Sequence, residues 1–319
     1  MTAEPIDAVV AWVDGGDPVH RAKRARFDAG AAEASVAGER FEEAGEILYC
    51  LRSLLRFAPF LRRIHVVTDA QVPPAIARVR EENPAWAERI VVVDHHEVFR
   101  DHEAMLPTFN SRSIEAVLHR IPELSERFIY LNDDVLLARP HREADFFMGP
   151  PVLRGRWRWL RPSALEAVTS PFRSGPRRAG NARGQERAAR LAGFRWRYAH
   201  AGHVPHAMRR STIEAFHDAN PAVLERQIAH RFRSAEQFLP TALARHLELR
   251  DGAPLHEPND DGYLRPDHAR RMGVVDQTLR ALLEERYATF CVQELSAFEP
   301  SARRRILAAF EALLPPPSH

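Results

Sequence analysis

Residues 128–134 read FIYLNDD, an apolar run that closes on an asparagine and two aspartates. Three earlier runs have the same form and end in one acid each: AVVAWVD at 8–14, IHVVTD at 64–69 and IVVVD at 90–94. Near-continuous apolar runs of this length favour strands that are buried on both faces, as in a parallel sheet. Between the runs, apolar residues recur at helical spacing. This alternation predicts the α/β class, with a Rossmann-like open, mainly parallel sheet and flanking helices.

The acids that end these runs would meet at one edge of the sheet. Ligands in open α/β sheets bind outside the carboxyl ends of the strands. Acids that are packed together repel one another unless a cation or protons neutralise them. Asp is also a common turn residue after a strand, and we accept that interpretation for Asp69. It explains the adjacent pair Asp133 and Asp134 poorly, so the sequence predicts a ligand or cation site at this edge.

The composition excludes several classes of protein. The chain has 319 residues with 45 basic and 43 acidic side chains, and its net charge is +2. This balance argues against a nucleic-acid coat, so no nucleic-acid partner is expected. The two cysteines, Cys50 and Cys291, are too few for a disulfide framework and are expected to be buried thiols. We find neither a secretory leader nor a transmembrane segment and expect a cytoplasmic protein, with the inner face of the membrane as one setting for its action.

We expect a single catalytic domain over residues 1–319. Residues 150–197 differ in character, because they hold twelve arginines against two glutamates. This segment is either a solvated basic insertion or a flap that closes over a polyanionic substrate. Residues 200–314 are expected to be mostly helical. Helices are predicted at 205–216, 221–229, 235–247, 276–285 and 301–313, and a strand at 287–292.

Four patches carry a resemblance to a known family. Residues 6–18, IDAVVAWVDGGDP, resemble the first conserved region of the Stealth family, and residues 106–135, which begin LPTFNSRSIE and end FIYLNDDV, resemble the second. Residues 202–208, GHVPHAM, together with residues 231–237, RFRSAEQ, resemble the third conserved region, and residues 291–294, CVQE, resemble the fourth. Stealth proteins are bacterial exopolysaccharide phosphotransferases related to the catalytic subunit that places GlcNAc-1-phosphate on lysosomal enzymes. A match of this length is far more specific than a short motif.

The resemblance implies an enzyme that moves hexose-1-phosphate from a UDP-sugar donor to a hydroxyl of a capsular or other cell-surface glycan and releases UMP. A metal and an arginine would neutralise phosphate oxygens while a base accepts the hydroxyl proton. Oxygen ligands favour Mg²⁺ or Mn²⁺ over zinc. The catalytic candidates are Asp14, Asp134, His203, His206 and Arg233; the substrate-binding candidates are Asn110, Arg112, Asn132 and Gln293; the metal candidates are Asp133, Asp134 and Glu294.

Three positions depart from the family pattern. Leu48 stands where the family has an arginine, and Gln293-Glu294 stand where it has Asn-Asp, so each of these polar groups reaches one methylene further. Two other functions stay open, the first because an Asp-Asp pair at a strand end fits it equally well and the second because of these departures. One is a metal-dependent glycosyltransferase that releases UDP, and the other is a silent member that binds nucleotide-sugar or glycan. The sequence does not identify the sugar, the acceptor or the oligomeric state.

Overall fold

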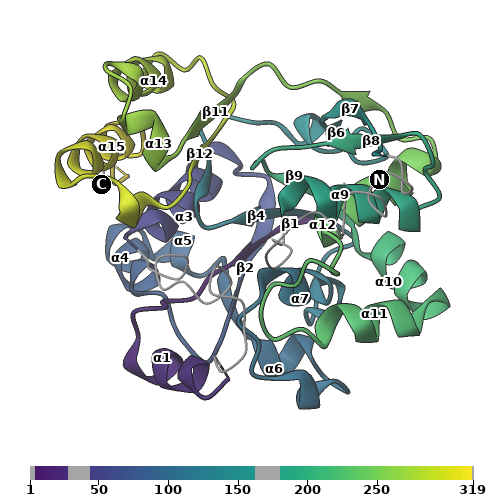
Figure 1. The fold of residues 1–319 in the computed structure, drawn as a ribbon. Helices are drawn as coiled ribbons and strands as arrows, with labels where there is room; N and C mark the ends of the chain where they lie inside the picture. Colours follow the sequence, from purple (N-terminus) through teal and green to yellow (C-terminus); the bar gives the residue numbers. More distant parts are fainter. Residues whose placement is uncertain (1–3, 28–43, 162–179, 318–319) are drawn as a thin grey trace.

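A five-stranded sheet forms the centre of the molecule (Figure 1), in a computed structural model that describes residues 4–27, 44–161 and 180–317. The strand order is β3-β2-β1-β4-β9. The first four strands are parallel, and β9 runs antiparallel to β4 at one edge. The predicted α/β class with an open, mainly parallel sheet is confirmed. The strands are β1 (Ile6–Ala11), β2 (Leu61–Thr68), β3 (Ile90–Asp94), β4 (Arg127–Asn132) and β9 (His206–Arg209).

Both faces of β1 are buried, which explains its unbroken apolar run. Ala8 and Val10 pack into one core cluster, and Val9 packs into another on the opposite face. The first cluster is covered by α3 (Glu46–Phe57), α4 (Pro74–Glu82), α14 (Val274–Leu283) and α15 (Pro300–Leu313). The second is covered by α6 (His95–Val98), α7 (Ser111–Glu115), α10 (Arg210–Ala219) and α11 (Pro221–Ile228).

One carboxylate lies within β1, just before its apolar run. Asp7 is fully buried and accepts two hydrogen bonds from the Arg62 guanidinium, at 3.0 and 2.7 Å, and one from the Ser125 backbone N–H at 2.8 Å. Burial alone would raise the pKa of Asp7, but the hydrogen bonds from His65, Arg62 and Ser125 hold it well below its ordinary value. Asp7 therefore ties β1 to β2 and to the start of β4.

A second, smaller sheet of order β11-β12-β5 adjoins the carboxyl end of β4. β5 (Val135–Leu137) follows β4 after a two-residue turn and pairs antiparallel with β12 (Thr289–Val292), which is parallel to β11 (Asp261–Leu264). The strand predicted at 287–292 is confirmed. The register places Cys291 opposite Val135, next in sequence to Asp134. Both cysteines are buried free thiols, as the composition indicated.

The remaining elements lie at several places around the two sheets (Figure 1). The arginine-rich segment holds β6 (Leu153–Arg154), β7 (Arg156–Trp159) and α9 (Asn181–Leu191) and reaches the start of β8 (Arg197–His200), which pairs antiparallel with β7. Part of the predicted flap, residues 162–179, lies outside the described residues. The other elements are α1 (Pro18–Ala25), α5 (Pro84–Ala87), α12 (Pro240–Arg250), β10 (Leu255–His256) and α13 (Pro266–Ala269), with 3₁₀ turns at Glu103–Met105, Leu118–Arg120, Glu143–Asp145 and Leu295–Ala297.

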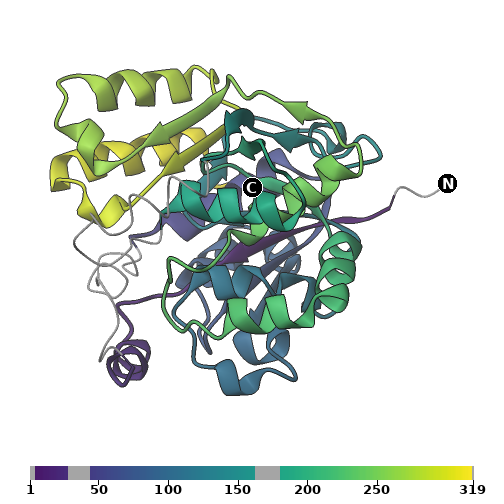
Figure 2. The ribbon, with the colours of Figure 1, turned by 45° about the vertical axis from the view of Figure 1, so that its right-hand side comes forward.

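The C-terminal part differs from the sequence prediction at two helix starts. The segment predicted as a helix from 205 begins with strand β9, and the helix α10 starts only at Arg210. The helix predicted from 235 starts at Pro240, because a proline is tolerated only in the first helical turn. Helices α14 and α15 pack together at one end of the molecule in both views (Figures 1 and 2). Every helix within the described ranges is too short or too polar to cross a bilayer.

Candidate functional site

A pocket of about 300 Å³ opens where β1 and β4 end. Ala11, the last residue of β1, and Asn132, the last residue of β4, line its floor, as open parallel sheets require. The pocket also borders the smaller sheet and the loop that follows α11. Its polar and titratable lining residues are His20, Glu46, His95, Thr108, Asn110, Ser111, Asn132, Asp133, Asp134, His203, Arg233, Gln293 and Glu294.

The acid pair lies in the turn between β4 and β5. The backbone carbonyl of Asp134 accepts a hydrogen bond from the Val292 N–H at 3.0 Å, which fixes the turn against β12. Oδ1 of Asp134 is buried and has no hydrogen-bond partner in the described part of the chain. Burial, and then repulsion by Glu46, raise the pKa of Asp134 to about 7. A buried carboxylate oxygen without a partner, beside a second acid, is suited to a cation.

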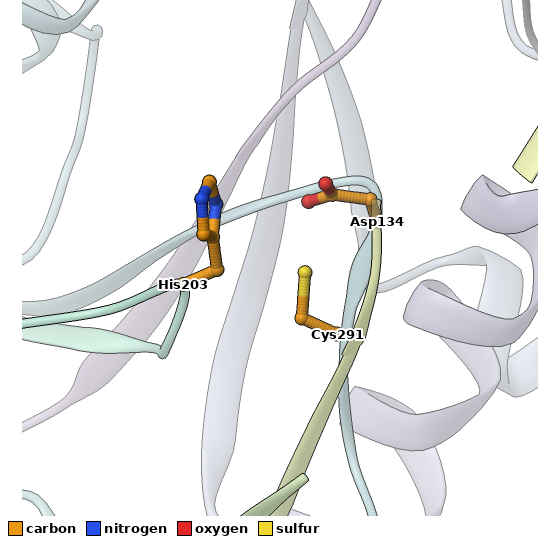
Figure 3. A group of neighbouring side chains, drawn as sticks. All are labelled: Asp134, His203 and Cys291. Atoms are coloured by element: carbon orange, nitrogen blue, oxygen red, sulfur yellow. The ribbon is translucent and has the colours of Figure 1, made fainter. Parts of the chain in front are cut away.

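A nitrogen and a sulfur atom complete one possible metal site. His203, Asp134 and Cys291 each offer one ligand atom, and these atoms lie within 4.8 Å of one another (Figure 3). The figure shows the Asp134 carboxylate facing the His203 imidazole, with the Cys291 thiol pointing toward the carboxylate. The structure therefore contains a group of side chains that could hold a divalent metal.

Arg233 supplies positive charge to the same pocket. Its Nη2 donates a hydrogen bond to the Ser111 hydroxyl at 2.7 Å. Burial lowers the pKa of Arg233, and the neighbouring acidic groups, first Glu115 and then Tyr130 and Asp134, oppose that shift. Glu115 is itself buried, and burial raises its pKa to about 7, with Arg233 acting in the opposite direction. This buried acid beside the arginine was missed by the sequence analysis.

Asn110 and Arg112 hold the loop that carries Arg233. Nδ2 of Asn110 donates to the carbonyls of His230 and Phe232, at 2.9 and 3.0 Å, and to Oε1 of Gln237 at 2.8 Å. Its Oδ1 accepts from the Arg112 N–H and so caps α7. Asn110 lines the pocket, but its side-chain amide donates its hydrogen bonds to other groups of the protein. The Arg112 guanidinium lies outside the pocket lining and donates to the carbonyls of Ser234 and Gly180.

The two predicted base candidates occupy different environments. His203 lines the pocket and stacks on Tyr263, with ring centroids 5.7 Å apart. Burial, and then the charge of Arg233, lower its pKa. His206 is the first residue of β9, opposite Tyr130 of β4, and it does not line the pocket. Burial, followed by Arg245 and His203, lowers the pKa of His206 to about 3.

The acids that end the predicted strands also differ in whether they line the pocket. Asp14 follows β1 but lies outside the pocket lining, and its Oδ1 accepts a hydrogen bond from the Gly16 N–H at 2.7 Å. Asp69 pairs with Lys23 at 2.9 Å, and Asp94 caps α6. The strand-end acids therefore do not all face one cavity. Only Asp133 and Asp134 do so.

Residues 291–294, the fourth of the patches that resemble the family, include one residue with a left-handed backbone beside the pocket. Glu294 adopts the left-handed conformation, with φ of 55°, a region in which Asp and Asn are enriched and Glu is not. Oε1 of Gln293 accepts a hydrogen bond from the Tyr263 hydroxyl. Both residues line the pocket. The longer side chains therefore stay at the site, and Gln293 is held against the residue on which His203 stacks.

Two lining residues gave no signal in the sequence. Glu46 starts α3, where an acid is a common first-turn residue, and its pKa is raised by burial. His95 is the first residue of α6, and both of its ring nitrogens are buried without a hydrogen-bond partner within the described ranges. Each residue is far in sequence from the acid pair. Only the folded sheet brings them to one pocket.

Comparison with known proteins assigns the chain to a family. Residues 4–31 match the model of Stealth protein conserved region 1, and residues 40–151 match that of conserved region 2. Receptor polysaccharide phosphotransferase WefC of Streptococcus oralis is 31% identical over 263 residues, which cover 72% of this chain and 74% of that protein. The chain belongs to the Stealth family.

Other relatives are longer than this Stealth chain. Exopolysaccharide phosphotransferase SCO6023 of Streptomyces coelicolor is 35% identical over 323 residues, which cover 98% of this chain and 52% of the relative. The chain thus spans about half of that protein. Among solved structures, galactosyltransferase LgtC in complex with donor and acceptor sugar analogs is 13% identical with a TM-score of 0.45, and each chain is 98% covered. A likeness at this level carries no argument about activity.

Proposed function

We propose that this Stealth chain transfers hexose-1-phosphate from a UDP-sugar to a hydroxyl of a cell-surface glycan and releases UMP. The observation that carries the proposal is one pocket that gathers an acid pair, a buried arginine and a histidine: Asp133 and Asp134, Arg233, and His203. These are the groups that phosphoryl transfer needs for charge neutralisation and proton removal. The names of the relatives, all polysaccharide phosphotransferases, support this class of reaction.

In the proposed reaction, the acceptor hydroxyl oxygen attacks the phosphorus that bears the sugar. The bond from this phosphorus to the oxygen shared with the second phosphorus breaks, and UMP leaves with that oxygen. His203 would accept the hydroxyl proton on a ring nitrogen, because a lowered pKa leaves it neutral at pH 7. Arg233 would bind the phosphate oxygens, and its hydrogen bond to Ser111 fixes its direction.

Asp133, Asp134 and Glu294 would hold Mg²⁺ or Mn²⁺. The unpartnered, buried Oδ1 of Asp134 fits such an ion, and all three carboxylates line the pocket. A bound divalent ion would neutralise negative charge on the donor diphosphate. Glu294 is the ligand whose reach depends most on its strained backbone, with φ of 55°.

The remaining candidates take proposed roles according to where they lie. Asn132 and Gln293 line the pocket, and we assign them to donor contacts. Asn110 and Arg112 act as positioning residues for the loop of Arg233. Asp14 and His206 lie outside the pocket lining, so their catalytic roles stay predictions from the resemblance.

The exposed face of the β7–β8 pair is a candidate acceptor surface. Arg197 lies opposite Trp159 in the pairing, and its guanidinium lies 4.1 Å from the centroid of the Trp157 ring. Trp159 is 80% exposed. Indole faces pack on sugar rings, and arginine binds phosphate, so this face suits a sugar-phosphate polymer. Chain continuity supports the assignment, because β8 ends at His200 and His203 follows in the pocket.

The released nucleotide tests the proposal. Purified protein would be incubated with Mg²⁺ or Mn²⁺, UDP-sugars and glycan acceptors, and the nucleotides separated by anion exchange. We expect metal-dependent UMP from the wild type, none from Asp134→Ala, and unchanged release from Arg270→Ala, whose side chain is 85% exposed. UDP in place of UMP would establish the glycosyltransferase alternative. Metal-dependent donor binding without any product would establish the silent alternative.

A further inference from the structure

Three separate segments bring a nitrogen, an oxygen and a sulfur ligand together beside the pocket. Asp134 lies in the β4–β5 turn, His203 in the connection from β8 to β9, and Cys291 within β12 (Figure 3). One ligand atom from each lies within 4.8 Å of the other two. Tetrahedral ligands of a single zinc ion are about 3.5 Å apart, given metal–ligand bonds of about 2.0–2.3 Å. Small side-chain rotations are enough to reach that spacing.

The atoms of this group select a different ion from the one that the acid pair selects. Mg²⁺ and Mn²⁺ prefer carboxylate, carbonyl and water oxygens, whereas a thiolate with an imidazole is typical of Zn²⁺ and of its spectroscopic substitute Co²⁺. Three protein ligands with an open fourth position are also common in zinc sites. The pocket beside His203 and Asp134 leaves room for a water molecule in that position.

The surroundings of Cys291 and Asp134 favour a cation as well. Oδ1 of Asp134 is buried and has no hydrogen-bond partner within the described residues. Glu46 acts electrostatically on Asp134, whereas Asp134, to which the Cys291 thiol also donates a hydrogen bond, and after it Asp133 act on Cys291. Arg233 opposes a cation here, but its Nη2 is bonded to Ser111 and its charge also interacts with Glu115.

We propose that Asp134, His203 and Cys291 form a binding site for a thiophilic divalent cation of the Zn²⁺ or Co²⁺ type. On binding, the S–H bond of Cys291 breaks, a sulfur–metal bond forms and the proton passes to solvent, with no change of oxidation state. The site shares Asp134 with the proposed Mg²⁺ or Mn²⁺ site and takes up His203. Occupancy therefore blocks turnover in competition with Mg²⁺ or Mn²⁺, and this inhibitory consequence alone rests on the proposed function.

Cobalt absorption tests the site without any need for activity. Full-length protein would be titrated with Co²⁺ alone and followed through the near-ultraviolet sulfur-to-cobalt band and the visible bands that report coordination number. We expect one equivalent to bind with four-coordinate spectra. Cys291→Ser should remove the sulfur band. Cys50→Ser should keep it, because this second buried thiol donates to the Asn132 carbonyl and lies outside the ligand group.

A second variant covers the case in which Cys291→Ser fails to fold. His203→Asn keeps the sulfur but should weaken cobalt binding at least about tenfold and shift the visible bands. The proposal is overturned by a wild-type spectrum without a sulfur band, by a band that survives Cys291→Ser, or by His203→Asn binding cobalt like the wild type. If cobalt binds and no UDP-sugar is ever turned over, the site stands and the proposed function fails. If UMP is released and cobalt does not bind, the proposed function stands and the cation site fails.

Discussion

Replacing Asn110 with alanine tests whether this residue positions the Arg233 loop or contacts the donor. The change removes three hydrogen bonds from Nδ2 and the cap on the Arg112 N–H, all at a fully buried position. Each buried group left unpaired costs about 1–3 kcal/mol, but relaxation and water recover part of the loss. We therefore expect a loss of about 3 kcal/mol. For a chain of this length that corresponds to a fall in Tm of about 4–5 °C.

Calorimetry and steady-state kinetics together measure the two roles of Asn110. We expect Asn110→Ala to lower Tm and kcat, because Arg233 follows one residue after Phe232, whose carbonyl loses its donor. Asn220→Ala is the matched control, since its Nδ2 donates one hydrogen bond at a half-buried site and its loss should cost about 1 kcal/mol. An unchanged Tm with a raised KM for the donor would refute the positioning role and return Asn110 to substrate binding.

Four further changes follow from the same contacts. Asp7→Asn should cost about 3 kcal/mol near pH 7 by calorimetry. The folded pKa of Asp7 lies below its unfolded value of 3.8, so the ionised carboxylate stabilises the fold above that pH, and this stabilisation is lost as the pH falls. The Tm values of the wild type and of Asp7→Asn should therefore converge toward acid pH and not toward alkaline pH. Gly262→Ala would place a methyl group 2.7 Å from Cε2 of the buried Phe290 ring and should cost about 1–3 kcal/mol in denaturant unfolding; wild-type stability would mean that the ring moves freely. Arg233→Lys should lower kcat about 100-fold at an unchanged Tm, and a change in Tm alone would assign the residue to folding. Trp159→Ala should raise the KM for the acceptor and leave Tm and donor KM unchanged, whereas an unaltered acceptor KM would move the acceptor to another surface.

The sheet could be predicted because its strands are buried on both faces and therefore leave long apolar runs. The apolar runs at residues 8–13 and 128–132 each predict a strand and the sheet edge at which it ends. The smaller sheet was visible only at 287–292, because β5 has only three residues and β11, with the sequence DGYL, contains no apolar run. The close approach of Cys291 to Asp134 depends on antiparallel register between strands far apart in sequence, and no local signal encodes it.

The site residues were found by resemblance, but their roles depend on side-chain direction. The resemblance makes Asn110 and Arg112 substrate-binding candidates, yet in the folded chain both donate hydrogen bonds to backbone carbonyls. His203 and His206 are three residues apart, and the turn into β9 places only His203 in the pocket lining. Glu115 ends the same short helix that Asn110 caps, and only the fold brings Arg233 beside it.

The position of the broken bond tests the central claim most directly. A UDP-sugar donor labelled with ¹⁸O between the anomeric carbon and phosphorus would be incubated with the enzyme, Mn²⁺ and an acceptor, and the products examined by mass spectrometry. Phosphoryl transfer leaves the carbon–oxygen bond intact, so we predict that the label travels with the sugar into the phosphodiester product and that UMP is unlabelled. Label retained on released UDP would show attack at carbon and would contradict the assignment of this pocket to phosphoryl transfer.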